Sequence, residues 1–332
     1  MKTARFTITF IFFIFFTSSF SQEANDTTDN PYFISYRDRL QINAIGVIKL
    51  NSFDITDNLK KNDVFEYSTN ENFNIGLGFN YKWLGFSMAF NLPAINNDDE
   101  LYGKTTGIDL QLDVYTKKWL FNFSSNFYSG FYWKNPDLIY SDWNIKDSVD
   151  IHPDIASVLI SASGLFTIKD DQVSLRSAYI GNESQQHSAG SWLIGWQTSV
   201  YGMGSENRLL PDIVMTNYPN IYRTQSLSSF TLGISFGYTY TYVGKKGFFA
   251  NFVALPGINL QSVNTKQFGN EELYTKPGLS SRFNLRFSLG FQKENYYLAF
   301  QGIGDTYNLK TDFDTRYKYS YGRIKLQYGY RF

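Results

Sequence analysis

The sequence has no cysteine, only two histidines and no excess of either charge. Without cysteine the chain has no disulfide, no thiolate metal site, no cysteine nucleophile and no residue to carry an N-terminal lipid anchor. His152 and His187 are too few for a zinc site built mainly on imidazoles, and we expect no metal and no cofactor. The 30 basic and 30 acidic side chains cancel, which excludes nucleic-acid binding through bulk charge. Phosphate-loop, dinucleotide-binding and zincin motifs are also absent.

The chain also lacks any apolar run of the ~18 residues that a membrane-spanning helix needs. Its mostly apolar N-terminal stretch, residues 6–16, follows Lys2 and Arg5 and is itself followed by Ser19-Phe20-Ser21. A positive start, a short apolar stretch and small residues at a cleavage position are typical of an export signal. This order predicts a signal peptide over residues 1–21; the alternative is an uncleaved N-terminal anchor.

The sequence is rich in aromatic residues, although the chain as a whole is polar. Aromatic residues make up 19% of the chain, yet the mean hydropathy is −0.30. From residue 72 to the end, apolar and polar residues alternate with period two, which puts them on opposite faces of β-strands. For example, every even position from Phe230 to Tyr242 is aromatic or aliphatic, and every odd position from Ser229 to Thr241 is Ser, Thr or Gly.

A soluble β-sandwich alternates too, but two features favour a transmembrane barrel. The stretches 229–243 and 319–332 exceed the ~5–6 residues usual in globular sheets and reach the ~9–11 that cross a membrane at a tilt. Their apolar face is uniformly bulky, which suits a lipid-facing surface better than an interdigitated core. We therefore predict an all-β antiparallel barrel over residues 38–332 in the cell outer membrane of a Gram-negative bacterium, preceded by a periplasmic arm over residues 22–37. Its partners would include outer-membrane lipid and lipopolysaccharide.

The alternation marks thirteen stretches as candidate strands. These are 41–53, 71–81, 83–92, 105–116, 118–131, 155–167, 172–182, 189–202, 228–243, 246–261, 281–292, 295–305 and 319–332. Since single-chain bacterial barrels normally have an even number of strands, we expect about twelve, with fourteen as the next choice. The connection at 183–188 breaks the phase and is the weakest point of the assignment.

The connections between these stretches differ in length, and tight turns usually face the periplasm. Tight turns are predicted near 82–83, 117–118, 169–171, 244–247 and 293–295. Long connections, predicted to face outward, lie at 54–70, 93–104, 132–154, 203–227, 262–280 and 306–318.

The first candidate site is the polar face of the barrel wall. Charged residues recur on that face; those predicted to line the lumen are Asp109, Asp113, Arg282, Arg286, Arg323 and Lys325, with Arg331 on the same face of the last strand. The arrangement indicates a charged pore or ligand site, or alternatively side chains of opposite sign that pair and hold a narrow barrel shut. We favour the paired, closed arrangement for a barrel of this size.

The second candidate is a Ser–His pair on residues 185–191. Some outer-membrane barrels hydrolyse or transfer lipid acyl groups with a serine and a histidine. Ser188 points to the face opposite His187, and Ser191 is separated from that histidine by ~13 Å of extended strand. His187 and Ser191 are therefore weak catalytic candidates, and a polar loop that opens a strand is the alternative.

The third candidate is the acidic, aromatic connection 132–154. Its carboxylates and rings resemble the ingredients of a calcium or sugar site; they are Asp137, Asp142, Asp147, Asp150, Asp154, Trp133, Tyr140 and Trp143. Their spacing fits no EF-type loop, and Lys134 and Lys146 offset part of the charge. A solvated outer loop is the simpler interpretation.

Four motifs make the chain similar to an uncharacterised outer-membrane barrel family of the Bacteroidota, known as a domain of unknown function. They are Pro31–Leu40 in the arm, Leu77–Gly85 at the first hairpin, Tyr102–Thr105 running into Asp109–Leu112, and His187–Ser191. The last strand, which ends on the aromatic Phe332, resembles the signal that such barrels present to their assembly machinery. The resemblance implies the fold and the location, and no functional residue.

Three functions remain open at this point. The first is a structural or partner-binding barrel, which we favour and which is not an enzyme. The second is a narrow pore for small solutes or ions, and the third is an outer-membrane lipid-modifying enzyme that uses Ser191 and His187.

Overall fold

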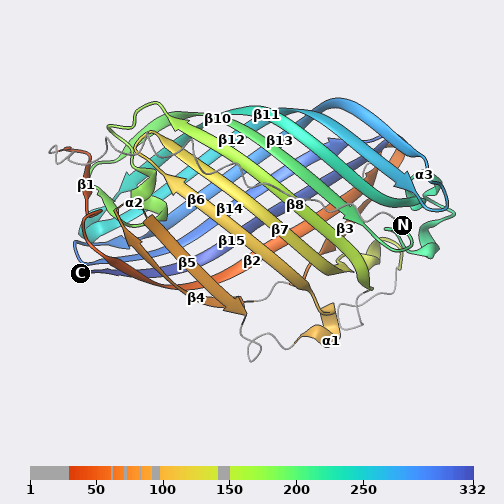
Figure 1. Ribbon diagram of the computed structural model, residues 1–332, viewed down its shortest axis with the longest axis horizontal. Coiled ribbons are helices and arrows are strands. Elements are labelled where there is room, and N and C mark those ends of the chain that lie inside the picture. The colour runs from red at the N-terminus through yellow and green to blue at the C-terminus, as the bar shows by residue number, and fades with distance from the viewer. Residues whose placement is uncertain (1–29, 61–62, 71–72, 83, 92–97, 141–149) are drawn as a thin grey trace, which may run out of the picture. The chain divides into compact units, whose positions relative to one another are not determined.

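The computed structural model describes residues 30–60, 63–70, 73–82, 84–91, 98–140 and 150–332 (Figure 1). Within it, Pro31–Phe332 forms one compact unit, which is described here by itself. The predicted signal peptide, residues 1–21, lies outside the described residues, as does the first half of the predicted arm, residues 22–29. No helix in the described ranges is long and apolar enough to cross a membrane.

Antiparallel strands make up most of this unit. The strands are β1 (Phe33–Ser35), β2 (Gln41–Asp57), β3 (Val64–Ser68), β4 (Phe73–Tyr81), β5 (Leu84–Asn91), β6 (Thr106–Tyr115), β7 (Trp119–Trp133), β8 (Ile151–Thr167), β9 (Glu183–Gln185), β10 (Ala189–Gly204), β11 (Thr224–Val243), β12 (Phe248–Gln267), β13 (Leu273–Gln292), β14 (Tyr296–Lys310) and β15 (Thr315–Arg331). Short helices lie in the connections: α1 (Asp99–Tyr102), α2 (Leu175–Tyr179), α3 (Pro219–Tyr222) and the 3-10 turns Asn58–Lys60, Pro136–Leu138, Asp212–Val214 and Lys245–Gly247.

Ten strands form a closed antiparallel ring, and three more, β4, β5 and β6, lie outside it. Around the ring the order is β2, β15, β14, β13, β12, β11, β10, β8, β7 and β3, which returns to β2. Along one edge, β2 pairs with two different strands: its residues Gln41–Ile48 pair with β4, and its residues Ser52–Thr56 pair with β3. β5 pairs with β4, and β6 pairs with β7.

Every predicted strand stretch except 172–182 lies on a strand of the structure. The stretch 172–182 is wrong, because it contains the helix α2. A barrel of about twelve strands is not confirmed, because the ring has ten members and one of them is the short β3, which the alternation did not predict. The long connections predicted at 262–280 and 306–318 are also wrong, because β12 to β15 extend through most of those residues.

The outward face of the strands carries a belt of exposed apolar side chains. On β11, for example, Leu232 and Ile234 are 49% and 72% exposed, while Thr231 between neighbouring outward residues is fully buried. The same alternation gives exposed side chains on the other strands, among them Leu77, Phe86, Leu110, Ile160, Trp192, Leu260, Phe283, Phe300 and Leu326. So large an apolar surface needs an apolar environment, because water would penalise it.

Candidate functional site

One end of the ring is filled by the connection between β8 and β10, residues 168–188, which we call the plug. Its helix α2 begins at Ser174, whose hydroxyl accepts a hydrogen bond from the Ser177 N–H at 3.0 Å. All five residues of α2 are buried, and the chain leaves the helix through Gly181, at φ +82°. The plug is also tied to the N-terminal arm, because β9 pairs with β1. Figure 1 shows β1, α2 and the C-terminus at this same end.

The barrel wall supplies hydrogen-bond donors for the carbonyl groups of the plug. The Ala178 carbonyl accepts from the side chains of Ser288, Tyr297 and Gln301. The Gly181 carbonyl accepts from the Arg331 guanidinium, whose Nε lies 2.9 Å away. These carbonyls would otherwise be buried without partners, so the contacts hold the plug inside the ring.

The opposite end is closed by the connection between β10 and β11, residues 205–223, which we call the cap loop. Its apolar side chains join a buried cluster with inward side chains of the strands; the cap-loop members are Leu209, Leu210, Val214, Tyr218, Ile221 and Tyr222. Tyr218 donates a hydrogen bond to Asp63 at 2.8 Å. Burial, with help from this carboxylate, raises the pKa of Tyr218 to about 12, so the hydroxyl keeps the proton that it donates.

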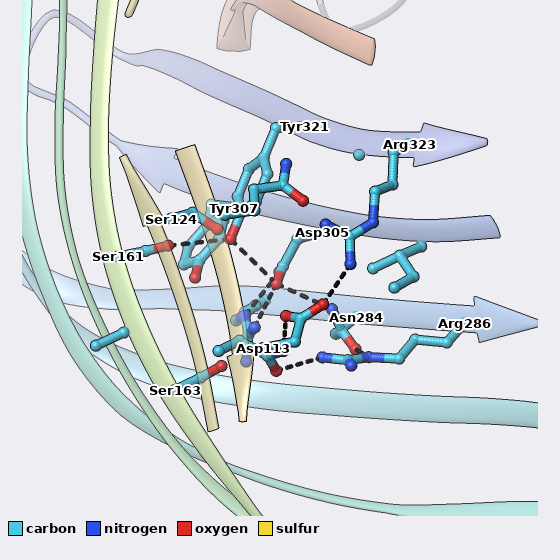
Figure 2. Close-up of a pocket in the computed structure, with 16 residues that line it drawn as sticks. Asp113, Ser124, Ser161, Ser163, Asn284, Arg286, Asp305, Tyr307, Tyr321 and Arg323 are labelled. Carbon is cyan, nitrogen blue, oxygen red and sulfur yellow. Dashed lines mark hydrogen bonds and ion pairs between the residues drawn. The ribbon is translucent and has the colours of Figure 1, made fainter. Parts of the chain in front are cut away.

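Between the two closures lies a polar layer, shown in Figure 2. Arg282 on β13 is paired with Asp305 on β14, and its Nε donates to that carboxylate at 2.6 Å. Arg323 on β15 is paired with Asp113 on β6, across the ring. Arg286 donates to Asn122 at 2.7 Å, and Asn122 in turn donates to Asp113. Arg282 and Arg323 are thus paired with carboxylates, as low-polarity surroundings require, and Arg286 is bonded to asparagine side chains.

The polar layer leaves little free space. The cavity among its side chains has a volume of about 30 Å³, which is room for a water molecule or two and for no larger solute. Above it, the rings of Tyr201, Tyr307 and Tyr319 stack, with centroids 4.0 and 4.7 Å apart. The layer and the stack together fill the cross-section on the cap-loop side.

A larger cavity of about 710 Å³ lies between the polar layer and the plug. Asp109, Asp113, Arg323 and Lys325 border it, whereas Arg282 and Arg286 belong to the polar layer. Asp109 accepts a hydrogen bond from Tyr128 at 3.0 Å and lies 3.9 Å from the Lys49 ammonium. Lys325 has no hydrogen bond or ion pair with any residue that the structure describes.

The two weak catalytic candidates are not brought together. The Ser191 hydroxyl is buried, where it accepts from the Lys169 N–H at 2.8 Å and donates to the Trp192 carbonyl at 3.0 Å. His187 is exposed, and its ring packs edge-on against Tyr32 at 5.9 Å. The serine thus holds backbone in place, and no base lies against it among the described residues.

The acidic connection 132–154 is described in part, since Asp142, Trp143, Lys146 and Asp147 lie outside the described residues. Asp150 lies 3.6 Å from His152, and Asp154 accepts a hydrogen bond from Ser205. Within the described ranges, no group of acidic or histidine side chains is arranged to hold a metal ion.

Sequence reasoning missed several members of the interior. The alternation on 295–305 puts Asp305 on the same face as Gln301. The period-two pattern could therefore have identified Asp305 as an inward carboxylate able to pair with Arg282. Asn122 and Tyr128 lie on β7 opposite Asp113 and near Asp109, and finding them required the register of β6 on β7. The plug had a different signal, a capping serine at Ser174 with a glycine after the helix.

Comparisons with known proteins give a family and a general likeness. The family model described as "Domain of unknown function (DUF4421)" matches residues 25–332. No curated protein matches the sequence. Among solved structures, the outer membrane protease OmpT from Escherichia coli is 8% identical, with a TM-score of 0.42, over 90% of this chain and 98% of that one.

Two further structures are similar in the same loose way. The translocator domain of the autotransporter NalP from Neisseria meningitidis is 7% identical, with a TM-score of 0.33, over 89% of this chain and 88% of that one. The toluene transporter TodX of P. putida is 9% identical, with a TM-score of 0.25, over 89% and 90%. At this level the likeness carries no information about activity.

Proposed function

The chain belongs to the DUF4421 family, whose function is unknown, and we propose from its own residues that it is an outer-membrane barrel closed at both ends, with a structural or binding role. The observation that carries this proposal is the plug, whose carbonyl groups are hydrogen-bonded to the wall that surrounds them. A segment held in this way is part of the folded barrel and not a loop that drifts out of a pore.

The outer-membrane location is supported by the exposed apolar belt and by the predicted export signal. An outward face on which Ile234 is 72% exposed is stable in lipid and costly in water. Lipid and lipopolysaccharide would contact this belt, and the exposed Phe332 at the end of β15 would meet the assembly machinery. The four sequence motifs favour the Bacteroidota as the source.

The pore and the enzyme are less well supported. In the polar layer Arg282 binds Asp305, Arg323 binds Asp113 and Arg286 binds asparagine side chains, so their charges are not available to a passing ion. The Ser191 hydroxyl is occupied by backbone groups and His187 is turned to Tyr32. A closed binding barrel therefore accounts for more of the interior than either alternative.

Conductance of the refolded protein in a planar bilayer tests the proposal. Because the two closures act in series, we expect no steady current from the intact chain, from a variant with residues 173–182 replaced by a Gly-Ser linker, or from one with residues 206–222 replaced. The double replacement should stay silent as well, because the polar layer between the closures still has no room for a solute larger than water. A control with the same linker in place of residues 268–272 should stay silent, and heat-modifiable gel mobility verifies folding of each variant. Steady current through the intact chain would contradict the closed barrel and favour the pore.

A further inference from the structure

The wall of the barrel is open at one side. β5 pairs with β4 and β6 pairs with β7, but no ladder joins β5 to β6 in the ranges that the structure describes (Figure 1). Towards the cap-loop end the ring closes through β3, which meets β7 at the residue pairs Tyr67–Trp133 and Ser68–Tyr132. Towards the plug end, β2 has β4 and β5 beside it, and β7 has β6, so the opening lies between these two groups of strands.

The 710 Å³ cavity reaches this side opening. Its lining includes consecutive residues of both flanking strands, 86–89 on β5 and 109–113 on β6. Among them are Met88 and Leu110, whose side chains are 49% and 65% exposed on the outward face. The cavity therefore borders the unpaired edges of both strands, beside the apolar belt.

The lining of the cavity carries an excess of positive charge. The lining contains five cationic side chains and two carboxylates: Lys49, Lys82, Arg176, Arg323 and Lys325 against Asp109 and Asp113. Asp113 is held by Arg323, and Asp109 by Lys49 and Tyr128. Arg176 lies 3.8 Å from Glu183 in the plug. Lys325 is half-buried and has no ion pair of its own among the described residues, since Asp113, whose charge acts on it, is held by Arg323. This arrangement favours an anionic ligand beside Lys325.

We propose that the cavity binds a single-chain amphipathic anion that enters sideways from the membrane. The anionic head lies at Lys325, and the acyl chain passes through the side opening along Met88 and Leu110. The volume lies within the ~300–1,000 Å³ typical of small-molecule sites. This inference rests on the proposed function, since it needs the belt to lie in lipid.

The backbone at the opening supports the same occupant. The free edges of β5 and β6 present unpaired N–H and C=O groups, which pure hydrocarbon cannot satisfy. Water and a polar head group in the cavity can form hydrogen bonds with these groups. If β5 and β6 formed a ladder with each other, their edges would need no such partner. A carboxylate of a free fatty acid and a phosphate of a lysophospholipid have the required chemistry in common.

Binding to the full chain, refolded in a non-ionic detergent, tests the site. A fluorescent fatty acid serves as the reporter, and palmitate, a sixteen-carbon lysophosphatidate, hexadecanol and inorganic phosphate serve as competitors. We expect palmitate or the lysophosphatidate to displace the reporter, and whichever does so more tightly identifies the source of the head group. Hexadecanol should compete at least ten-fold more weakly, and phosphate without a chain should not compete.

Two pairs of variants locate the binding. Lys325→Met should weaken binding of the anion about 10–100-fold, as expected for a lost charge-assisted contact, while the exposed-turn control Lys245→Met should not. Because the chain has no cysteine, Ser87→Cys can be labelled with a bulky maleimide to block the side opening, with labelled Asn308→Cys on the far wall as control. We expect the block at position 87 to abolish uptake.

Three results would overturn the inference: equal affinity of Lys325→Met and the unmodified chain, equal competition by hexadecanol and palmitate, or unaltered binding after the block. Its failure is distinguishable from failure of the closed barrel. Current through an intact chain that still binds palmitate at Lys325 would remove the closed ends and leave the site. A silent bilayer together with no binding of palmitate would keep the closed ends and remove the site.

Discussion

The plug can be loosened by adding one methyl group at Gly181. A Cβ at this position would lie 2.3 Å from the ring of Tyr297, well inside the ~3.5–4.0 Å of a favourable carbon contact. The φ of +82° adds the strain of a left-handed residue, roughly 1–2 kcal/mol. Overpacking adds about 1–3 kcal/mol, so Gly181→Ala should destabilise the docked plug by about 2–5 kcal/mol.

Gly269 provides a matched control for the backbone strain. It has φ +75° in the turn between β12 and β13, and a Cβ there would meet nothing within 4 Å. Gly269→Ala should therefore cost the strain of about 1–2 kcal/mol without the clash. The difference between the two variants isolates the contact of the plug with Tyr297.

The assay uses Ser177→Cys, a buried position in α2 of a chain that has no other cysteine. Labelling by a water-soluble maleimide reports how often the plug undocks. Because the strain at position 269 is not relieved when the plug undocks, the Gly181→Ala background carries the whole difference of about 2–5 kcal/mol and should label about 30–5,000-fold faster than the Gly269→Ala background. Equal labelling rates in the two backgrounds would refute the close packing of Gly181 against Tyr297, and with it the docked plug.

Two further predictions concern the interior. Asp305→Asn should lower the free energy of unfolding by about 3–5 kcal/mol in a urea titration, because it leaves Arg282 buried without its partner. The double variant Arg282→Met/Asp305→Leu should recover most of this loss. No recovery would mean that the broken ion pair is not the cause of the loss. Ser191→Ala should cost about 0.5–1.5 kcal/mol, because the Lys169 N–H, at a partly exposed position, loses its acceptor. The substitution should leave any lipid hydrolysis unchanged, and hydrolysis that disappears in this variant would reinstate the enzyme.

The strands were predictable because each one separates two unlike environments. On 229–243 the outward face is apolar and the inward face is small and polar, so period two appears directly in the sequence. The stretch 172–182 failed for the opposite reason. A helix enclosed by the barrel is buried on every side, and Val173, Leu175 and Tyr179 therefore gave it no polar face with helical period.

The candidate site was predictable residue by residue but not as an arrangement. Alternation put Asp113 and Arg323 on the inward face of their strands. Their pairing joins β15, a ring strand, to β6, which lies outside the ring and pairs with β7, so it depends on the curvature of the closed wall. The side opening depends on β2 changing its neighbour from β4 to β3 partway along its length, and a pattern within one strand carries no signal of that change.

The short contact between β3 and β7 also affects how the wall moves. Among the described residues, β5 has a ladder only with β4 and β6 only with β7. Bending at those two ladders changes the width of the opening while every ladder of the ring stays formed, and the ion pair of Arg323 with Asp113 limits how far β6 can move. Backbone amides on the free edges would exchange their hydrogens rapidly, whereas those in the long ladders from β10 to β13 would exchange only when the whole barrel unfolds. Breathing of the wall and loss of the fold are thus separate processes, with separate barriers.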